Sequence, residues 1–241
     1  MNLALECKKL KRTGFFPAML AGGLVAALFP LVNTAVRPEM FVSQPLPALD
    51  ILMQANGQMI AMLNLCLAVV GACILYHTEF SGNAMQKMES LPVRAGALFG
   101  YKCVLLLLAL LAALVIEHIA LAFCALHWFP EQSGLFTALL KNLEYSLALM
   151  TPPAVILMIV SSLCRNMWIT LGAGVTCIFA ASMLPADSRI LSLFPFSLPF
   201  QTLTEAPDST WIFITLAGCA AELLLAALAE AVILKARRRY A

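Results

Sequence analysis

The sequence predicts an all-α integral membrane protein with about six transmembrane helices. Of its 241 residues, 62% are hydrophobic and 12% are charged, whereas soluble domains are nearer half apolar and a quarter charged. The apolar residues gather in runs of ~20 residues, the length at which a helix crosses a ~30 Å hydrocarbon core. The charged residues gather between those runs. So few charges cannot cover a water-facing surface, which excludes an ordinary soluble domain.

Six apolar runs define the expected helices of one membrane domain covering residues 1–241. They are residues 15–36, 54–76, 103–126, 143–164, 167–184 and 211–234. The run at 167–184 is the shortest. The first run follows a basic stretch, as in a signal peptide, but it is longer than a typical signal core. It also lacks a small-x-small cleavage site, so we expect an uncleaved helix.

The distribution of lysine and arginine predicts that both termini lie in the cytoplasm. Basic residues favour the cytoplasmic side of short loops. With the N-terminus inside, the inner segments carry Lys8, Lys9, Lys11, Arg12, Lys87, Arg94, Lys102, Arg165, Lys235, Arg237, Arg238 and Arg239. The outer segments carry only Arg37, Lys141 and Arg189. Both terminal basic clusters lie inside only if the number of crossings is even, which agrees with six.

Residues 1–14 show the pattern of a short amphipathic helix. One face carries Leu3, Cys7 and Leu10, and the other carries Lys8, Lys9 and Arg12. Such a helix either lies on the cytoplasmic leaflet with its cations near anionic head groups, or its charges only orient the first transmembrane helix. The pattern leaves both interpretations open.

Several kinds of chemistry have no support in the sequence. The net charge of +2 is too small to indicate nucleic-acid binding. The eight cysteines and three histidines are scattered without metal-ligand spacing. No phosphate-binding Gly-x-x-x-x-Gly-Lys-Ser/Thr motif occurs, and no His-Glu-x-x-His motif occurs. We therefore expect no metal site, no cofactor and no catalysis in this chain.

The segment between the second and third expected helices is the most informative cytoplasmic region. Phe80, Ala84 and Met88 share one face of a short helix that Pro92 ends. A short amphipathic helix beneath the membrane suits a groove on a soluble partner. The alternative is that it lies on the lipid.

This segment resembles the cytoplasmic loop of type-2 ABC exporter permeases. The resemblance rests on Glu79, Gly82, the sequence Ser-Leu-Pro-Val-Arg at 90–94, and Lys102 at the start of the next helix. The pair Gly82 and Asn83 is similar to the bacitracin and lantibiotic self-protection branch.

Two other regions strengthen the resemblance. Glu6, followed by lysines, resembles the interfacial elbow helix of that family. The outer stretch 194–199 is similar to a proline-aromatic segment of the self-protection branch, although Phe196 and Leu198 stand where that branch has tryptophan and tyrosine.

The resemblance implies a bacterial plasma-membrane permease that binds no nucleotide itself. ATP and Mg would be held by two copies of a separate ATPase subunit, beside a second permease that is identical or related. The residues implied in coupling to the ATPase are Glu79, Phe80, Gly82, Asn83, Met85, Lys87, Met88, Leu91, Pro92 and Arg94. The implied substrate is a lantibiotic-like antimicrobial peptide, removed from the membrane toward the outside. Alternatives are another lipid-like or drug substrate, and a scaffold or channel-like subunit that transports nothing.

Candidate substrate-path residues come from charges and aromatic residues in the outer half of the membrane. Glu117 and Glu222 lie at similar depth, where a charge costs ~2.5–3.5 kcal/mol on insertion scales. Both could face the bundle interior together. They would then line a path for a cationic or amphipathic substrate; the alternative is that each is protonated or bonded to a neighbouring helix. Phe194, Phe196 and Phe200 lie in the outer loop at 185–210. They suit contact with a lipid-like peptide or ordinary interfacial anchoring.

Overall fold

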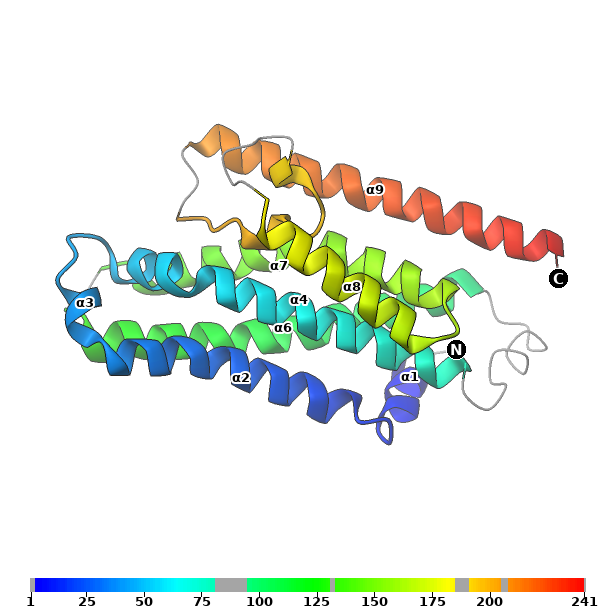
Figure 1. The fold of residues 1–241 in the computed structure, drawn as a ribbon, viewed down its shortest axis with the longest axis horizontal. Helices are drawn as coiled ribbons and strands as arrows, with labels where there is room; N and C mark the ends of the chain where they lie inside the picture. Colours follow the sequence, from blue (N-terminus) through cyan, green and yellow to red (C-terminus); the bar gives the residue numbers. More distant parts are fainter. Residues whose placement is uncertain (1–2, 81–94, 131–132, 185–190, 205–207, 241) are drawn as a thin grey trace.

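The computed structural model describes residues 3–80, 95–130, 133–184, 191–204 and 208–240. Regular structure in these residues is helical, and Figure 1 shows the long helices side by side along one axis. The elements are α1 (Leu3–Leu10), α2 (Phe15–Val36), α3 (Pro38–Val42), α4 (Ala48–Phe80), α6 (Ala95–Trp128), α7 (Leu135–Leu163), α8 (Met167–Ser182), η2 (Leu191–Leu193), η3 (Leu198–Phe200) and α9 (Ser209–Tyr240).

Five of these helices, α2, α4, α6, α7 and α9, are long and apolar enough to cross a membrane. The sixth expected span corresponds to α8, which has 16 residues. At 1.5 Å per residue it covers roughly 24 Å, less than the ~30 Å of a hydrocarbon core. The all-helical fold is confirmed, and the count of six spans is not. Several helices also run beyond the expected ends, because polar residues such as Glu79 lie inside the final turns.

Both ends of the chain lie at the same end of the bundle (Figure 1). The first helix, α1, packs against α6 there, and the last turns of α9 reach the same end. This is the arrangement that an even number of passages predicts; whether the short helix α8 is one of them stays a prediction. The apolar face expected for α1 is turned to protein, since Leu10 is buried in the main core. The side of the membrane on which this end lies stays a prediction.

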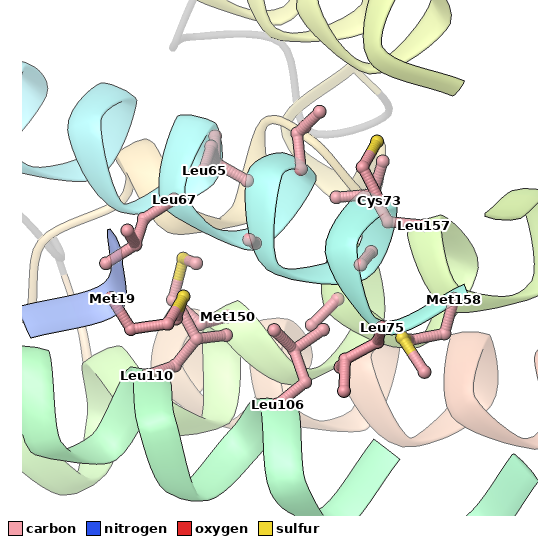
Figure 2. Packing of buried hydrophobic residues seen from close by; sticks show 14 of the residues in the cluster. Met19, Leu65, Leu67, Cys73, Leu75, Leu106, Leu110, Met150, Leu157 and Met158 are labelled. Carbon is pink, nitrogen blue, oxygen red and sulfur yellow. The ribbon is translucent and has the colours of Figure 1, made fainter. Parts of the chain in front are cut away.

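The core of the bundle is built around α4, which packs against α2, α6, α7 and α8. Figure 2 shows Leu75 of α4 beside Leu106 of α6, and Met150 of α7 beside Leu110 of α6; Leu65 of α4 belongs to the same buried cluster. By contrast, α9 packs mainly on α7 and leaves large leucines on its outer face. A helix with an apolar outer face is what contact with lipid or with another membrane helix requires.

Close contact between α2 and α6 depends on one glycine. A Cβ added to Gly23 would lie 3.0 Å from the Cα and Cβ of Ala113. Small residues let the backbones of membrane helices approach and gain dispersion energy that burial from water does not supply in lipid. A second glycine, Gly14, has φ of 78° in the turn between α1 and α2. That left-handed conformation lets α1 fold back against the bundle.

The connection before α9 enters the bundle, contrary to the expected exposed outer loop. We call residues 191–204 the inner segment. Phe196 is 5% exposed within the main core, and η3 packs against α4 and α7. The expectation of interfacial anchoring is therefore wrong for Phe196, whereas Phe194 remains 37% exposed. Periodicity gave no signal for this region because short turns, rather than a helix, carry its apolar side chains inward.

Hydrogen bonds from side chains hold the inner segment in place. The Ser197 hydroxyl lies 2.8 Å from the carbonyl oxygens of Leu191 and Phe194. The Gln201 amide donates to the Ser192 carbonyl, and its Oε1 accepts from Thr215 Oγ1 of α9 at 3.1 Å. Irregular backbone at membrane depth is tolerated only where protein or water satisfies its polar groups. These bonds meet that condition.

Candidate functional site

A cluster of buried charges joins three helices at the end of the bundle that holds α1. Lys102 of α6 lies 2.9 Å from Glu79 Oε1 at the end of α4, and 3.3 Å from Glu6 Oε2 of α1. Lys9 lies 2.7 Å from Glu6 Oε1 and 3.4 Å from Glu79 Oε1. We call these four residues the charge cluster. Two cations and two carboxylates balance within it.

Lys102 is the centre of the charge cluster because its side chain is almost fully buried, whereas that of Lys9 is partly exposed. The Lys102 side chain is 1% exposed, and its Nζ also donates to the Leu75 carbonyl at 3.0 Å and lies 5.6 Å from the ring centroid of Tyr76. A buried ammonium is stable only when its lost hydration is replaced by such partners. Removing one partner from a buried pair costs ~3–5 kcal/mol.

Lys9 lies at the open rim of the charge cluster, with 39% of its side chain exposed. Partial burial lowers the pKa of Lys9, but hydrogen bonds and charge interactions with Glu6 and Glu79 outweigh this and raise its pKa overall. Lys9 therefore keeps its charge to a higher pH in the folded protein than a free lysine does.

The charge cluster brackets the segment expected to couple to an ATPase. Glu79 lies at the end of α4 and Lys102 in the third turn of α6, and the chain between these helices includes residues 81–94. The Glu79 carboxylate is buried against Lys102, so it ties helices together instead of facing outward. Phe80 is half-buried against the core, with its ring 6.3 Å from that of Tyr76. The other predicted coupling residues lie outside the described residues: Gly82, Asn83, Met85, Lys87, Met88, Leu91, Pro92 and Arg94.

A second polar site lies near the middle of the bundle, around the predicted Glu117. Glu117 is fully buried, and its Oε2 accepts a hydrogen bond of 2.8 Å from Asn64 Nδ2 of α4. Glu117 Oε1 and Asn64 Oδ1 are buried without a hydrogen-bond partner. Both residues line a cavity of about 30 Å³, room for roughly two water molecules. We call this the polar cavity.

The neighbouring His118 is held by different partners. Asn142 Nδ2 of α7 lies 3.1 Å from His118 Nε2, and His118 Nδ1 lies 2.8 Å from the Leu114 carbonyl. An amide N–H is a donor and a carbonyl is an acceptor, so this geometry assigns the neutral tautomer with the proton on Nδ1. Both ring nitrogens are thus engaged, and His118 brings no cation to Glu117.

The inner segment forms one wall of the polar cavity. Pro199, Gln201 and Thr202 line it from that side, opposite Gly57 and Asn64 of α4. A Cβ added to Gly57 would lie 2.9 Å from Thr202 Cγ2. Glycine at this position is therefore what allows the inner segment to pack on α4. The arrangement encloses a carboxylate and an amide oxygen under a polar wall.

The other predicted substrate-path residues do not gather around Glu117. Glu222 is half-buried on α9 and does not line the polar cavity, so the two glutamates do not face one common site. Phe200 is partly buried beside the main core, and Phe196 is inside it. Asn64 and Asn142 were missed by sequence reasoning. Their signal was an amide side chain within an apolar helix, where each needs a partner on another helix.

Within the residues that the structure describes, no group of three histidine, cysteine, aspartate or glutamate side chains is arranged to hold a metal ion. What the two sites can do is therefore a matter of charge and hydrogen bonding. The charge cluster links α1, α4 and α6 through ion pairs. The polar cavity presents hydrogen-bond acceptor oxygens to a small bound group.

Comparison with known proteins gives one match. Residues 2–181 match the family model described as ABC-2 family transporter protein, which covers about three quarters of the chain. No curated protein and no solved structure matches the chain.

Proposed function

The chain belongs to the ABC-2 family of transporter proteins and is the membrane component of such a transporter; from this premise we propose that it exports an amphipathic substrate, a lantibiotic-like antimicrobial peptide. Membrane components of this family are not catalytic themselves, and an ABC permease implies an ATPase partner. The proposal adds that two ATPase copies bind ATP and Mg, and that a second permease, identical or related, completes the complex. It also places both termini in the cytoplasm of a bacterial cell.

The charge cluster is the observation that supports coupling most directly. It ties α1, the end of α4 and the start of α6 by ion pairs of 2.7–3.4 Å, on either side of the expected coupling segment. A push on that segment would thus move three helices as one body instead of bending a single helix. Such a rigid connection suits a transporter that alternates between two states under the control of ATP.

Support for the substrate comes from charge and surface within the membrane. The outer helix faces are apolar, and a carboxylate is buried at mid-depth beside a polar cavity. Carboxylates inside a membrane are costly and mark paths for ions or charged groups. A cationic, amphipathic peptide has both an apolar face for the helices and amines for the carboxylate.

The test is to co-express a tagged copy of the chain with a candidate ABC ATPase from the same genome and to load the cells with a fluorescent lantibiotic. We expect the ATPase to co-purify with the tagged chain and the peptide to leave the membrane for the medium. The matched control carries an ATPase whose phosphate-binding lysine is replaced. Peptide release that is equal in both strains would overturn coupling, and release of a lipid or drug but not the peptide would overturn the substrate.

A further inference from the structure

The polar cavity has more hydrogen-bond acceptors than donors. Asn64 spends a donor on Glu117 Oε2, which leaves Glu117 Oε1 and Asn64 Oδ1 buried and unpartnered. Buried oxygens in proteins almost always have a partner, so two such atoms on one cavity call for an occupant. The missing occupant must be a hydrogen-bond donor.

The charge of Glu117 is likewise not balanced by the residues around it. His118 is engaged at both ring nitrogens as a neutral imidazole. Among the described residues, the Lys–Glu ion pairs lie in the charge cluster, and none involves Glu117. A carboxylate at this depth is favourable only with a positive partner or a proton. The occupant that suits both requirements donates hydrogen bonds and carries a positive charge.

Size and coordination narrow the choice of occupant. The volume of about 30 Å³ takes a group the size of roughly two water molecules. Mg²⁺ and Ca²⁺ need six or more oxygen ligands, and the cavity offers one carboxylate with a few neutral oxygens. An ammonium group carries three N–H donors on one small charged centre, which matches unpartnered oxygens better than a metal ion does.

We propose that the polar cavity is a binding site for one ammonium group, carried by the molecule that the transporter moves. The assignment of that group to a transported molecule rests on the proposed function. Glu117 Oε1 and Asn64 Oδ1 accept its hydrogen bonds, and the Asn64 amide holds the carboxylate in place through Oε2. The wall formed by Gln201 and Thr202 separates the bound group from the apolar core.

The experiment measures binding to the purified full-length chain in detergent, with no ATPase or transport involved. Infrared difference spectra follow the carboxylate band of Glu117 while ethylammonium chloride is added, at constant ionic strength, up to about 100 mM. We expect a saturable band shift with ethylammonium and none with tetramethylammonium, which has no N–H donor. Ammonium chloride is the third probe. If the free ion binds at least tenfold more tightly than ethylammonium, the site takes a free ion and not a group on a carrier.

Variants give an independent readout of the same site. Glu117→Gln is expected to weaken ethylammonium binding at least tenfold, measured by the amide band shifts that remain. The matched control is Glu222→Gln, a carboxylate on α9 outside the cavity, which should bind as the parent does. If Glu117→Gln does not yield monodisperse protein, Asn64→Leu carries the same expectation. Comparing the three ammonium probes on the parent protein tests the proposal even if no variant can be purified.

Four results would overturn the proposal. One is the tighter binding of free ammonium described above. The others are saturation by tetramethylammonium equal to that by ethylammonium, unchanged binding in Glu117→Gln, and no saturable signal in the parent, which would mean that the cavity holds water only. Peptide release in cells is measured separately. Failure of binding here therefore does not imply failure of export, and failure of export leaves this binding result standing.

Discussion

The bundle buries charged groups in two places, which differ in whether each charge has a partner within the protein. In the charge cluster, Lys102 and Lys9 face Glu6 and Glu79, so the charges balance within the protein. In the polar cavity, Glu117 faces an amide, and two oxygens are left without partners. Charges that are paired with one another hold helices together, whereas a carboxylate with unpartnered oxygens is suited to bind another molecule. The comparison predicts that the same kind of substitution has opposite consequences at the two sites.

The largest effect is expected for Lys102→Met. Loss of the buried ammonium leaves Glu6 and Glu79 facing each other without their main cation, at a cost of ~3–5 kcal/mol in the free energy of unfolding. The thermal unfolding midpoint in detergent should fall sharply. Lys11→Met, which removes an exposed lysine, is the control. A midpoint that is equal in the two variants would mean that the charge cluster does not hold the helices.

Gly57→Val tests the wall of the polar cavity. Because even a Cβ at this position would lie 2.9 Å from Thr202 Cγ2, the larger side chain has to displace the inner segment from α4. Overpacking of this kind costs ~1–3 kcal/mol. Gly172→Val is the control, since nothing lies within 4 Å of a Cβ added there. Labelling of a cysteine introduced at Leu203, which leaves Thr202 in place, should increase in Gly57→Val, and unchanged labelling would contradict the packing described.

Lys9→Met separates the rim of the charge cluster from its centre. Its side chain is 39% exposed, so screening by water limits the loss to below about 1 kcal/mol.

The pKa of Lys9 is raised by Glu6 and Glu79 in the folded protein. Its contribution to stability is therefore complete below 10.5, the ordinary pKa of a lysine, and disappears as pH rises through the higher pKa of the folded protein. Unfolding midpoints of the parent and Lys9→Met should converge in strongly alkaline buffer. A difference that grows with pH would have the wrong sign.

The smallest change in stability is expected for Glu117→Gln. An amide keeps an acceptor for Asn64 and removes a carboxylate that costs free energy at mid-membrane depth. The unfolding midpoint should therefore stay the same or rise slightly, even though ethylammonium binding is lost. If the unfolding midpoint fell as far as in Lys102→Met, the Glu117 carboxylate would be a stabilising part of the fold, and the contrast between the two sites would fail.

The sequence predicted the parts of this fold that follow from long apolar runs. All six expected segments are helices, because backbone groups in lipid must be satisfied within a segment. The expected helices were too short where a charged residue is buried in the last turn, as at Glu79. In the sequence, a charged residue at the end of an apolar run looks like the start of a loop. The inner segment was missed for a related reason. Ser197 satisfies irregular backbone locally, and no periodic pattern reveals that Phe196 is turned inward.

The sites divide in the same way. The resemblance drew attention to Glu6, Glu79 and Lys102 in separate motifs, and the structure places them in one cluster. Glu117 stood out as a charge in an apolar run. Its partner Asn64 did not, because a single amide is compatible with many contacts. Which helix faces which is decided by packing across the whole bundle, as at Gly23 and Ala113, and the local sequence does not encode it.

The partners of Lys102 also set an order of assembly during synthesis. Glu6 leaves the ribosome first, Glu79 follows more than seventy residues later, and the lysine that neutralises both comes last. Until the third long helix has been made, α1 has no place to dock and must wait at the surface of the membrane. The N-terminal helix thus docks on α6 only after that helix has been made, and a chain that stalls before residue 102 has one lysine of the charge cluster, Lys9, for two carboxylates.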